Sequence, residues 1–225
     1  MPPLGPAPER APRAVIFDIG RVIIRIDLSR SMGALGQRDG LTHAQVLRAL
    51  EADARWEDWE EGRMTPHDWH AHLAKKLGFS YDFQEFCAIW NSVLAPDPIL
   101  PDALFEGLAA KCRLALLSNT DPLHVAHFET THTFPRHFPV RVYSCRVGVC
   151  KPSPVIFHHT LRELGALPEE ALFIDDLREN VLAAAALGIH GFHFTGPEDL
   201  ILPPETLGTL RGRPKAYHPN LLNSQ

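Results

Sequence analysis

The sequence has few of the features that mark secreted or membrane-bound proteins. It holds only four cysteines among 225 residues, and they are spaced too widely for a CxxC pair. Free cysteines are typical of a reducing compartment, although a bond between Cys145 and Cys150 stays open. No apolar run approaches the ~20 residues that a membrane-spanning helix needs. The first thirteen residues lack the apolar core of a signal peptide. We therefore expect a cytoplasmic protein without a membrane partner.

An excess of positive charge is also missing. Asp and Glu number 27 against 22 Lys and Arg, so the formal net charge is −5. Proteins that bind nucleic acid usually carry a basic surface, and we expect no such partner here. What is present is an ordinary globular composition, 45% hydrophobic and 22% charged. The length suits one domain, or one domain with a large insertion.

The most informative stretch is residues 14–24, Ala-Val-Ile-Phe-Asp-Ile-Gly-Arg-Val-Ile-Ile. Its first apolar run, Ala14 to Phe17, ends abruptly at Asp18. Such a run predicts a strand that is buried on both faces of a parallel sheet. Ligands bind beyond the carboxyl ends of strands in open α/β sheets, so Asp18 is a candidate catalytic residue. An aspartate that only caps a turn is the alternative.

The pattern along the chain predicts three parts. Residues 1–13, with five prolines, predict a disordered tail. Residues 28–96 show no strand-like alternation and predict helices, with helix starts at Thr42 and at Thr65-Pro66, and with Ala95 to Pro98 closing the block. Residues 14–27 and 97–225 alternate strands with helices, and the later strands are expected at 113–117, 140–143, 171–174 and 192–194. This alternation indicates an α/β fold with a doubly wound parallel sheet and a helical insertion after the first strand.

Polar residues follow three of the predicted strands. Asp18 follows the first, Ser118-Asn119-Thr120 the second, and Asp175-Asp176 the fourth, while Lys151 stands before a helix. Parallel strands bring their carboxyl ends to one edge, so these groups converge. Carboxylates suit Mg²⁺, and a lysine with a hydroxyl suits phosphate oxygens. The sequence therefore predicts a site for Mg²⁺ and an anion.

In this order, the polar segments resemble the four motifs of the haloacid dehalogenase superfamily, on its phosphatase side. Residues 17–22, Phe-Asp-Ile-Gly-Arg-Val, resemble the first motif, and residues 117–120, Leu-Ser-Asn-Thr, the second. Residues 148–157, Gly-Val-Cys-Lys-Pro-Ser-Pro-Val-Ile-Phe, resemble the third, and Phe-Ile-Asp-Asp at 173–176 with Asn180 resembles the fourth. The resemblance covers residues 14–196, and block 28–96 sits where the family places a C1 cap. Within the family it is most similar to bacterial sugar-1-phosphate phosphatases and the N-terminal phosphatase domain of soluble epoxide hydrolase.

The resemblance implies a function and a set of site residues. The function is Mg²⁺-dependent hydrolysis of a small phosphorylated metabolite, a sugar-phosphate-like monoester, through an aspartyl-phosphate. The implied catalytic residues are Asp18, Lys151 and Ser118. The implied substrate-binding residues are Ser118, Asn119, Lys151 and Arg21. The implied metal ligands are Asp18, the backbone carbonyl of Gly20, Asp176 and Asp175, with Asp176 as the direct ligand and Asp175 behind it.

Position 20 departs from the family pattern. Most phosphatases of the family carry an Asp there, two residues after the nucleophile, and it protonates the leaving group. Gly20 also occurs in similar sugar-phosphate phosphatases, but it leaves the general acid unidentified. His124 or a residue of the insertion stays open for that role. Two other functions stay open as well: a 2-haloacid dehalogenase that needs no metal, and a non-catalytic module that binds a phosphorylated ligand.

Overall fold

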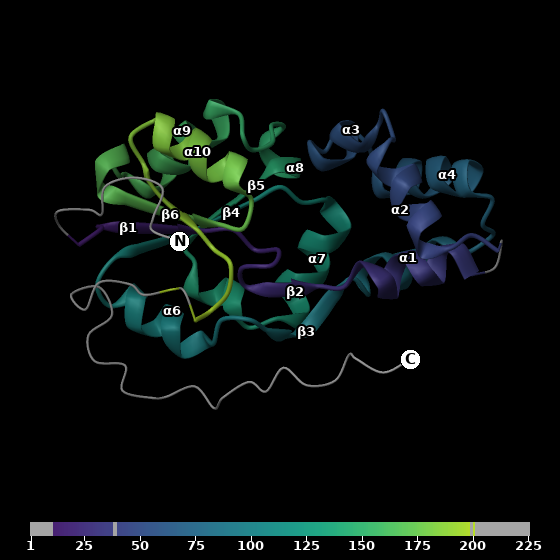
Figure 1. Cartoon of the computed structure of the whole chain (residues 1–225), viewed down its shortest axis with the longest axis horizontal. Helices are drawn as coiled ribbons and strands as arrows, with labels where there is room; N and C mark the ends of the chain where they lie inside the picture. The colour runs from purple at the N-terminus through teal and green to yellow at the C-terminus, as the bar shows by residue number, and fades with distance from the viewer. Residues whose placement is uncertain (1–10, 38–39, 199, 201–225) are drawn as a thin grey trace.

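A parallel sheet of five strands forms the centre of the protein (Figure 1). The computed structural model describes residues 11–37, 40–198 and 200, so most of the predicted tail at 1–13 lies outside the described residues. The strands follow the order β5-β4-β1-β6-β7. Their bounds are β1 Ala14–Phe17, β4 Arg113–Ser118, β5 Val140–Tyr143, β6 Ala171–Asp175 and β7 His190–His193. The chain builds outward from β1 first on one side and then on the other, which confirms the doubly wound α/β fold and makes the end of β1 a switch point.

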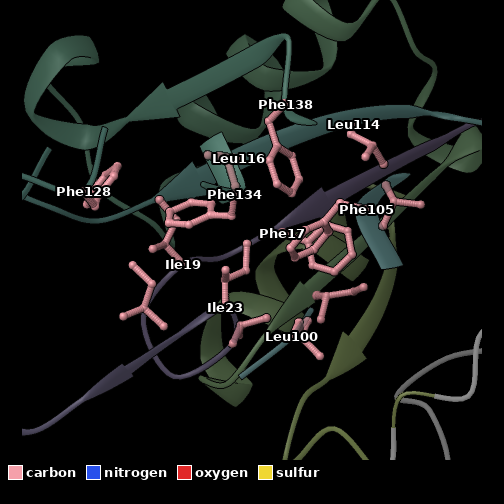
Figure 2. Close-up of a cluster of buried hydrophobic side chains, with 14 of the residues drawn as sticks. Phe17, Ile19, Ile23, Leu100, Phe105, Leu114, Leu116, Phe128, Phe134 and Phe138 are labelled. Carbon is pink, nitrogen blue, oxygen red and sulfur yellow. The ribbon is translucent and has the colours of Figure 1, made fainter. Parts of the chain in front are cut away.

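Strand β1 is buried because its side chains serve two separate cores. Val15 and Phe17 point into one hydrophobic cluster, and Ala14 and Ile16 into another, as the period of two along a strand requires. Figure 2 shows the first cluster, where the ring of Phe17 meets those of Phe105 and Phe138 edge-on at centroid distances of 5.5 and 5.8 Å. Apolar residues on both faces explain why this strand reads as a continuous apolar run.

Helices cover both faces of the sheet. Helices α6 (Asp102–Ala109) and α7 (Pro122–Thr131) supply side chains to the first cluster, and a 3₁₀ turn at Phe134–His137 adds to it. Helices α9 (Pro154–Leu164) and α10 (Arg178–Ala186) supply the second. The short helix α8 (Ser144–Val147) follows β5, and a 3₁₀ turn at Pro168–Glu170 precedes β6.

The helical insertion lies to one side of the sheet (Figure 1). Its helices are α1 Leu28–Gln37, α2 His43–Glu51, α3 Trp56–Glu60, α4 Pro66–Leu77 and α5 Phe83–Asn91. Thr42 and Gln45 form the predicted capping box of α2, and α4 begins after Thr65 and ends at Gly78, whose φ of 80° is left-handed. The buried members of a third hydrophobic cluster, from Met32 to Trp90, come from these helices and from the short links between them. We propose that they form a separate domain over residues 28–96.

Two segments of the insertion differ from the prediction. The expectation that residues 28–96 hold no strand was wrong, because β3 (Leu94–Pro98) begins within them and pairs antiparallel with β2 (Ile24–Ile26). This two-stranded ribbon joins the insertion to the sheet domain, and its two prolines are tolerated because the ribbon has only edge strands. Helix α3 was not predicted, since it has only five residues.

The structure also bears on the cysteines and on membrane-spanning segments. All four cysteines are free, so Cys145 and Cys150 form no disulfide. None of the helices within the described residues has the length and apolar content that a bilayer crossing requires.

Candidate active site

The carboxyl edge of the sheet brings the predicted residues together. Phe17 pairs with Leu116 on one side and with Ile174 on the other. The next residue, Asp18, therefore lies level with Leu117 and Asp175, and its N–H donates to the carbonyl of Ile174 at 2.9 Å. The register of three parallel strands thus places two carboxylates side by side.

Lys151 lies between these two carboxylates. Its Nζ donates to Oδ1 of Asp18 at 2.7 Å, to Oδ2 of Asp175 at 2.6 Å and to the carbonyl of Leu117 at 3.0 Å. The lysine is buried. Burial alone would lower the pKa of Lys151, but the charges of Asp18 and Asp175 raise it overall. The side chain is therefore an ammonium ion that holds both carboxylates in position.

Burial has the opposite effect on Asp18. Desolvation raises the pKa of Asp18 to about 6, against the lowering effect of Lys151, and the negative charge of Asp175 adds to the rise. A carboxylate that is poorly solvated yet charge-paired is a stronger nucleophile than one exposed to water.

The two neighbouring acids at the end of β6 have different surroundings. The carboxylate of Asp175 is fully buried and accepts from the N–H of Leu177 at 2.7 Å and from Nδ2 of Asn180 at 3.1 and 3.2 Å, besides Lys151. Asp176 is partly exposed, and its ion pair with Arg21 is longer, at 3.8 Å. Burial raises the pKa of Asp176 and the charge of Asp175 raises it further. Protein donors thus hold Asp175 more tightly than Asp176.

The end of β4 carries the predicted phosphate-binding residues. Ser118 is the last residue of the strand and is buried. Asn119 has both ends of its side-chain amide on the backbone of Lys151: Nδ2 donates to the carbonyl at 2.9 Å, and Oδ1 accepts from the N–H at 2.7 Å. Asn119 therefore fixes the loop that carries Lys151, a role that the sequence did not suggest.

Arg21 lies at the rim of the site. Its φ of 59° is left-handed, and its side chain is 54% exposed while it contacts Asp176. A cavity of about 450 Å³ opens beside it, and the lining residues are Arg21, Arg25, Ile26, Asp27, Leu28 and Ile99. The carboxyl edge of the sheet thus meets the β2–β3 ribbon at a basic rim.

His124 lies near the site, but both of its ring nitrogens are in use. Nδ1 lies 2.7 Å from Oδ2 of Asp121, and Nε2 lies 3.3 Å from the carbonyl of Trp90. Burial would lower the pKa of His124, but the charge of Asp121 raises it overall. Because both ring nitrogens face oxygen acceptors, both carry a proton and the ring is an imidazolium. This ring links α7 to α5 of the insertion.

One acidic residue near the site was missed in the sequence. Glu60 ends α3, and its charge neighbours include Lys151, Asp121 and His124. Desolvation raises the pKa of Glu60 to about 7, although a hydrogen bond from the Trp56 side chain opposes the rise. Nothing in the local pattern Trp-Glu-Asp-Trp-Glu-Glu-Gly separates this acid from the others around it. Only the folded arrangement distinguishes it.

Comparison with known proteins relates this arrangement to a family. The profile of haloacid dehalogenase-like hydrolases matches residues 12–188. The D-ribitol-5-phosphate phosphatase of Bacteroides thetaiotaomicron is 25% identical over 187 residues, which cover 79% of this chain and 89% of that protein. Acyl-CoA dehydrogenase family member 10 of Mus musculus is 37% identical over 212 residues, which cover 88% of this chain. The chain spans only 19% of that mouse protein's length.

A solved structure extends the likeness to three dimensions. An enzyme of the same family from Bacteroides thetaiotaomicron, crystallised with magnesium and inorganic phosphate, superposes with a TM-score of 0.73 at 25% identity. The match covers 84% of this chain and 98% of that one. With the profile match and with the residues of all four motifs gathered at one sheet edge, the chain belongs to the haloacid dehalogenase-like hydrolases.

Proposed function

We propose that this hydrolase cleaves a small phosphomonoester, with Mg²⁺ as cofactor and with an aspartyl-phosphate formed on Asp18. The observation that carries the proposal is the buried ammonium of Lys151 between the carboxylates of Asp18 and Asp175. The carboxylate of Asp18 is a nucleophile, and the positive charge beside it suits the dianion that it would attack. The related D-ribitol-5-phosphate phosphatase supports the same reaction class.

The acids at the sheet edge fit a magnesium ion. One oxygen from each of Asp18, Asp175 and Asp176 lies within 4.8 Å of the others. Mg²⁺ prefers a few carboxylate oxygens and keeps water or phosphate on its remaining positions. Because protein donors already bind Asp175, we assign Asp176 and Asp18 as direct ligands, with the Gly20 carbonyl beside them and Asp175 behind. Bound there, Mg²⁺ would offset the negative charge of the phosphoryl oxygens.

The residues of the site then divide the reaction between them. A carboxylate oxygen of Asp18 attacks phosphorus, and the ester bond breaks with its electron pair on the departing oxygen. Water attacks the aspartyl-phosphate in the second step, which releases phosphate and restores Asp18. The hydroxyl of Ser118 holds a phosphoryl oxygen, and the positive charge of Lys151 lies beside the phosphoryl group. Asn119 keeps Lys151 in place, and Arg21 contacts the substrate at the rim.

The substrate is proposed to be a phosphorylated sugar or polyol. The relative from Bacteroides thetaiotaomicron is named for a pentitol phosphate, and it matches this chain over most of both lengths. The helical insertion would act as a cap that closes over such a substrate and excludes water. Its helices share an aromatic core in which Trp59, Trp69 and Trp90 are buried together, so we propose that they move as one body.

A phosphate-release screen with an Asp18→Asn variant tests the proposal. The screen should cover sugar phosphates, polyol phosphates, nucleotides and aryl phosphates, each with Mg²⁺ and with EDTA. We expect phosphate release with Mg²⁺ from the wild type, and its loss in Asp18→Asn, because an amide is not a nucleophile. Asp97→Asn, an exposed acid on β3, is the matched control and should keep its activity.

Three results would overturn the proposal. Turnover by Asp18→Asn within tenfold of wild type would remove Asp18 as the nucleophile. Halide release from chloroacetate without metal would favour the dehalogenase. Binding of phosphate with no turnover of any ester would favour a binding module.

A further inference from the structure

The site as described lacks a proton donor for the departing oxygen. Position 20, where most phosphatases of the family carry an acid, is glycine in this chain. Lys151 is already bound by Asp18 and Asp175. His124 faces Asp121 and Trp90 with both of its nitrogens. A donor has to come from another element that reaches the site.

The end of α3 docks against the loops that carry Ser118 and Lys151. The carbonyl of Glu60 accepts from the hydroxyl of Ser144 at 2.7 Å. The same hydroxyl oxygen accepts from the N–H of Thr120 at 2.9 Å, two residues after Ser118. Oε1 of Glu61 accepts from the N–H of Cys150 at 3.2 Å, one residue before Lys151. The segment thus bridges the loops that carry Ser118 and Lys151.

The backbone of the next residue, Gly62, also lies close to the sheet domain. Gly62 has a φ of 70°, and a Cβ there would lie 2.1 Å from the carbonyl oxygen of Cys145. A side chain at this position would push the end of α3 away from the sheet domain. The backbone of residues 60–62 is therefore packed directly against the start of α8 and the Lys151 loop.

The side chain of Glu60 is half-buried at this junction. Trp56, one turn earlier on α3, donates a hydrogen bond to it. From the facing elements, its charged neighbours are Lys151 on the loop before α9, and Asp121 and His124 at the start of α7. Desolvation is the largest influence and raises the pKa of Glu60 to about 7. The carboxyl thus exists at neutral pH in both the acid form that gives a proton and the base form that takes one.

We propose that the Glu60 carboxyl gives a proton to the oxygen that leaves phosphorus and then takes one from the attacking water. This inference rests on the proposed phosphatase function. In the first step Asp18 bonds to phosphorus, the ester bond breaks, and the departing oxygen takes its electron pair and the Glu60 proton to become an alcohol. In the second step water gives that proton back to Glu60 as its oxygen bonds to phosphorus and the bond to Asp18 breaks. The sum is ester plus water to alcohol plus phosphate.

A comparison of leaving groups in a Glu60→Gln variant tests the assignment. Single-turnover phosphorylation should be measured on p-nitrophenyl phosphate, phenyl phosphate and glycerol phosphate, which span acidic to weakly acidic leaving groups. We expect Glu60→Gln to slow the glycerol ester by about 10²–10⁴-fold, the usual contribution of a general acid. The p-nitrophenyl ester, which needs no proton, should react within threefold of wild type, and this rate also shows that the variant is folded. Glu57→Gln on the same short helix, 75% exposed, is the matched control and should resemble wild type on all three.

Two further readouts separate proton transfer from a structural role. The wild-type rate on glycerol phosphate should fall as pH rises through about 7, because Glu60 loses the proton that it donates, and Glu60→Gln should lack this limb. Adding Gly20→Asp to Glu60→Gln should raise the rate on glycerol phosphate at least tenfold above that of Glu60→Gln alone. A Cβ at position 20 would lie 3.5 and 3.7 Å from Cγ1 and Cδ1 of Ile26, which are ordinary van der Waals contacts.

The outcomes also separate this inference from the proposed function. If Glu60→Gln slows all three esters equally, or slows none of them, Glu60 is not the proton donor. The proposed function still stands in that case, provided that Asp18→Asn abolishes turnover. If the wild type releases no phosphate from any ester, or Asp18→Asn remains active, the proposed function itself is wrong.

Discussion

Replacing Lys151 by Met would test how strongly one buried charge holds the site together. The ammonium contacts Asp18 at 2.7 Å, Asp175 at 2.6 Å and the Leu117 carbonyl at 3.0 Å. Methionine keeps the length and most of the volume of lysine, so the change removes the charge and the donors and leaves little cavity. Two carboxylates, 7% and 0% exposed, would then face each other without a cation.

The expected loss of stability in Lys151→Met follows from the burial of these groups. Removing one partner of a buried ion pair costs about 3–5 kcal/mol, because the remaining charge is left without compensation. For a chain of this size, 1 kcal/mol shifts the Tm by about 2–4 °C. We therefore expect Lys151→Met to lower the Tm in EDTA by roughly 6–20 °C. Phosphate release should fall below detection, since the variant also loses the positive charge beside the phosphoryl group.

Differential scanning calorimetry in EDTA measures the loss of stability, and the same scan with Mg²⁺ measures how much of it the cation restores. A cation bound near Asp18 and Asp176 should recover part of the lost stability, by about 2.7 kcal/mol at a hundred times its Kd. Lys75→Met, on the exposed side of α4, is the matched control and should unfold like the wild type. A Tm of Lys151→Met within 2 °C of wild type in EDTA would refute the reasoning, because it would mean that the two carboxylates tolerate each other without the ammonium.

Two other predictions concern the metal and the docking of the insertion. Asp176→Asn should weaken Mg²⁺ binding, with activity partly recovered at high Mg²⁺, whereas Asp175→Asn should mainly lower the rate; titrations with the opposite pattern would exchange their roles. Ser144→Ala leaves the N–H of Thr120 and the carbonyl of Glu60 without their partner, so we expect a loss of about 1–3 kcal/mol. A thermal scan should show this as a Tm lower by roughly 2–12 °C, and an unchanged Tm would mean that water or a backbone shift replaces the hydroxyl.

The sequence predicted those features whose causes are local. The run from Ala14 to Phe17 is apolar because both faces of β1 are buried, so it could be recognised without the rest of the chain. The helix starts at Thr42 and Thr65 are visible because a capping side chain bonds within three residues. The convergence of Asp18 with Asp175 is not local, but it could be predicted because the carboxyl ends of parallel strands meet at one edge of a sheet.

The features that were missed depend on distant contacts. Strand β3 is set by pairing with β2, on the opposite side of the insertion in sequence, and its own pattern of prolines argues against a strand. The hold of Asn119 on Lys151 joins residues 32 apart. Glu60 is placed by Ser144, 84 residues later, which no spacing within the segment Trp56 to Glu60 could reveal.

The location of the proposed proton donor has a consequence for how the reaction is controlled. An acid at position 20 would stay in the sheet domain whether or not the insertion is closed. Glu60 instead belongs to the insertion, and its backbone meets the sheet domain through Ser144. If the insertion moves to admit substrate, the donor moves with it, so an alcohol can leave phosphorus only after closure has brought Glu60 back. Esters with acidic leaving groups escape this requirement, because Asp18 and Lys151 stay together in the sheet domain. Weakening the docking by Ser144→Ala should therefore slow glycerol phosphate more than p-nitrophenyl phosphate, which ties proton delivery to the closed position of the insertion.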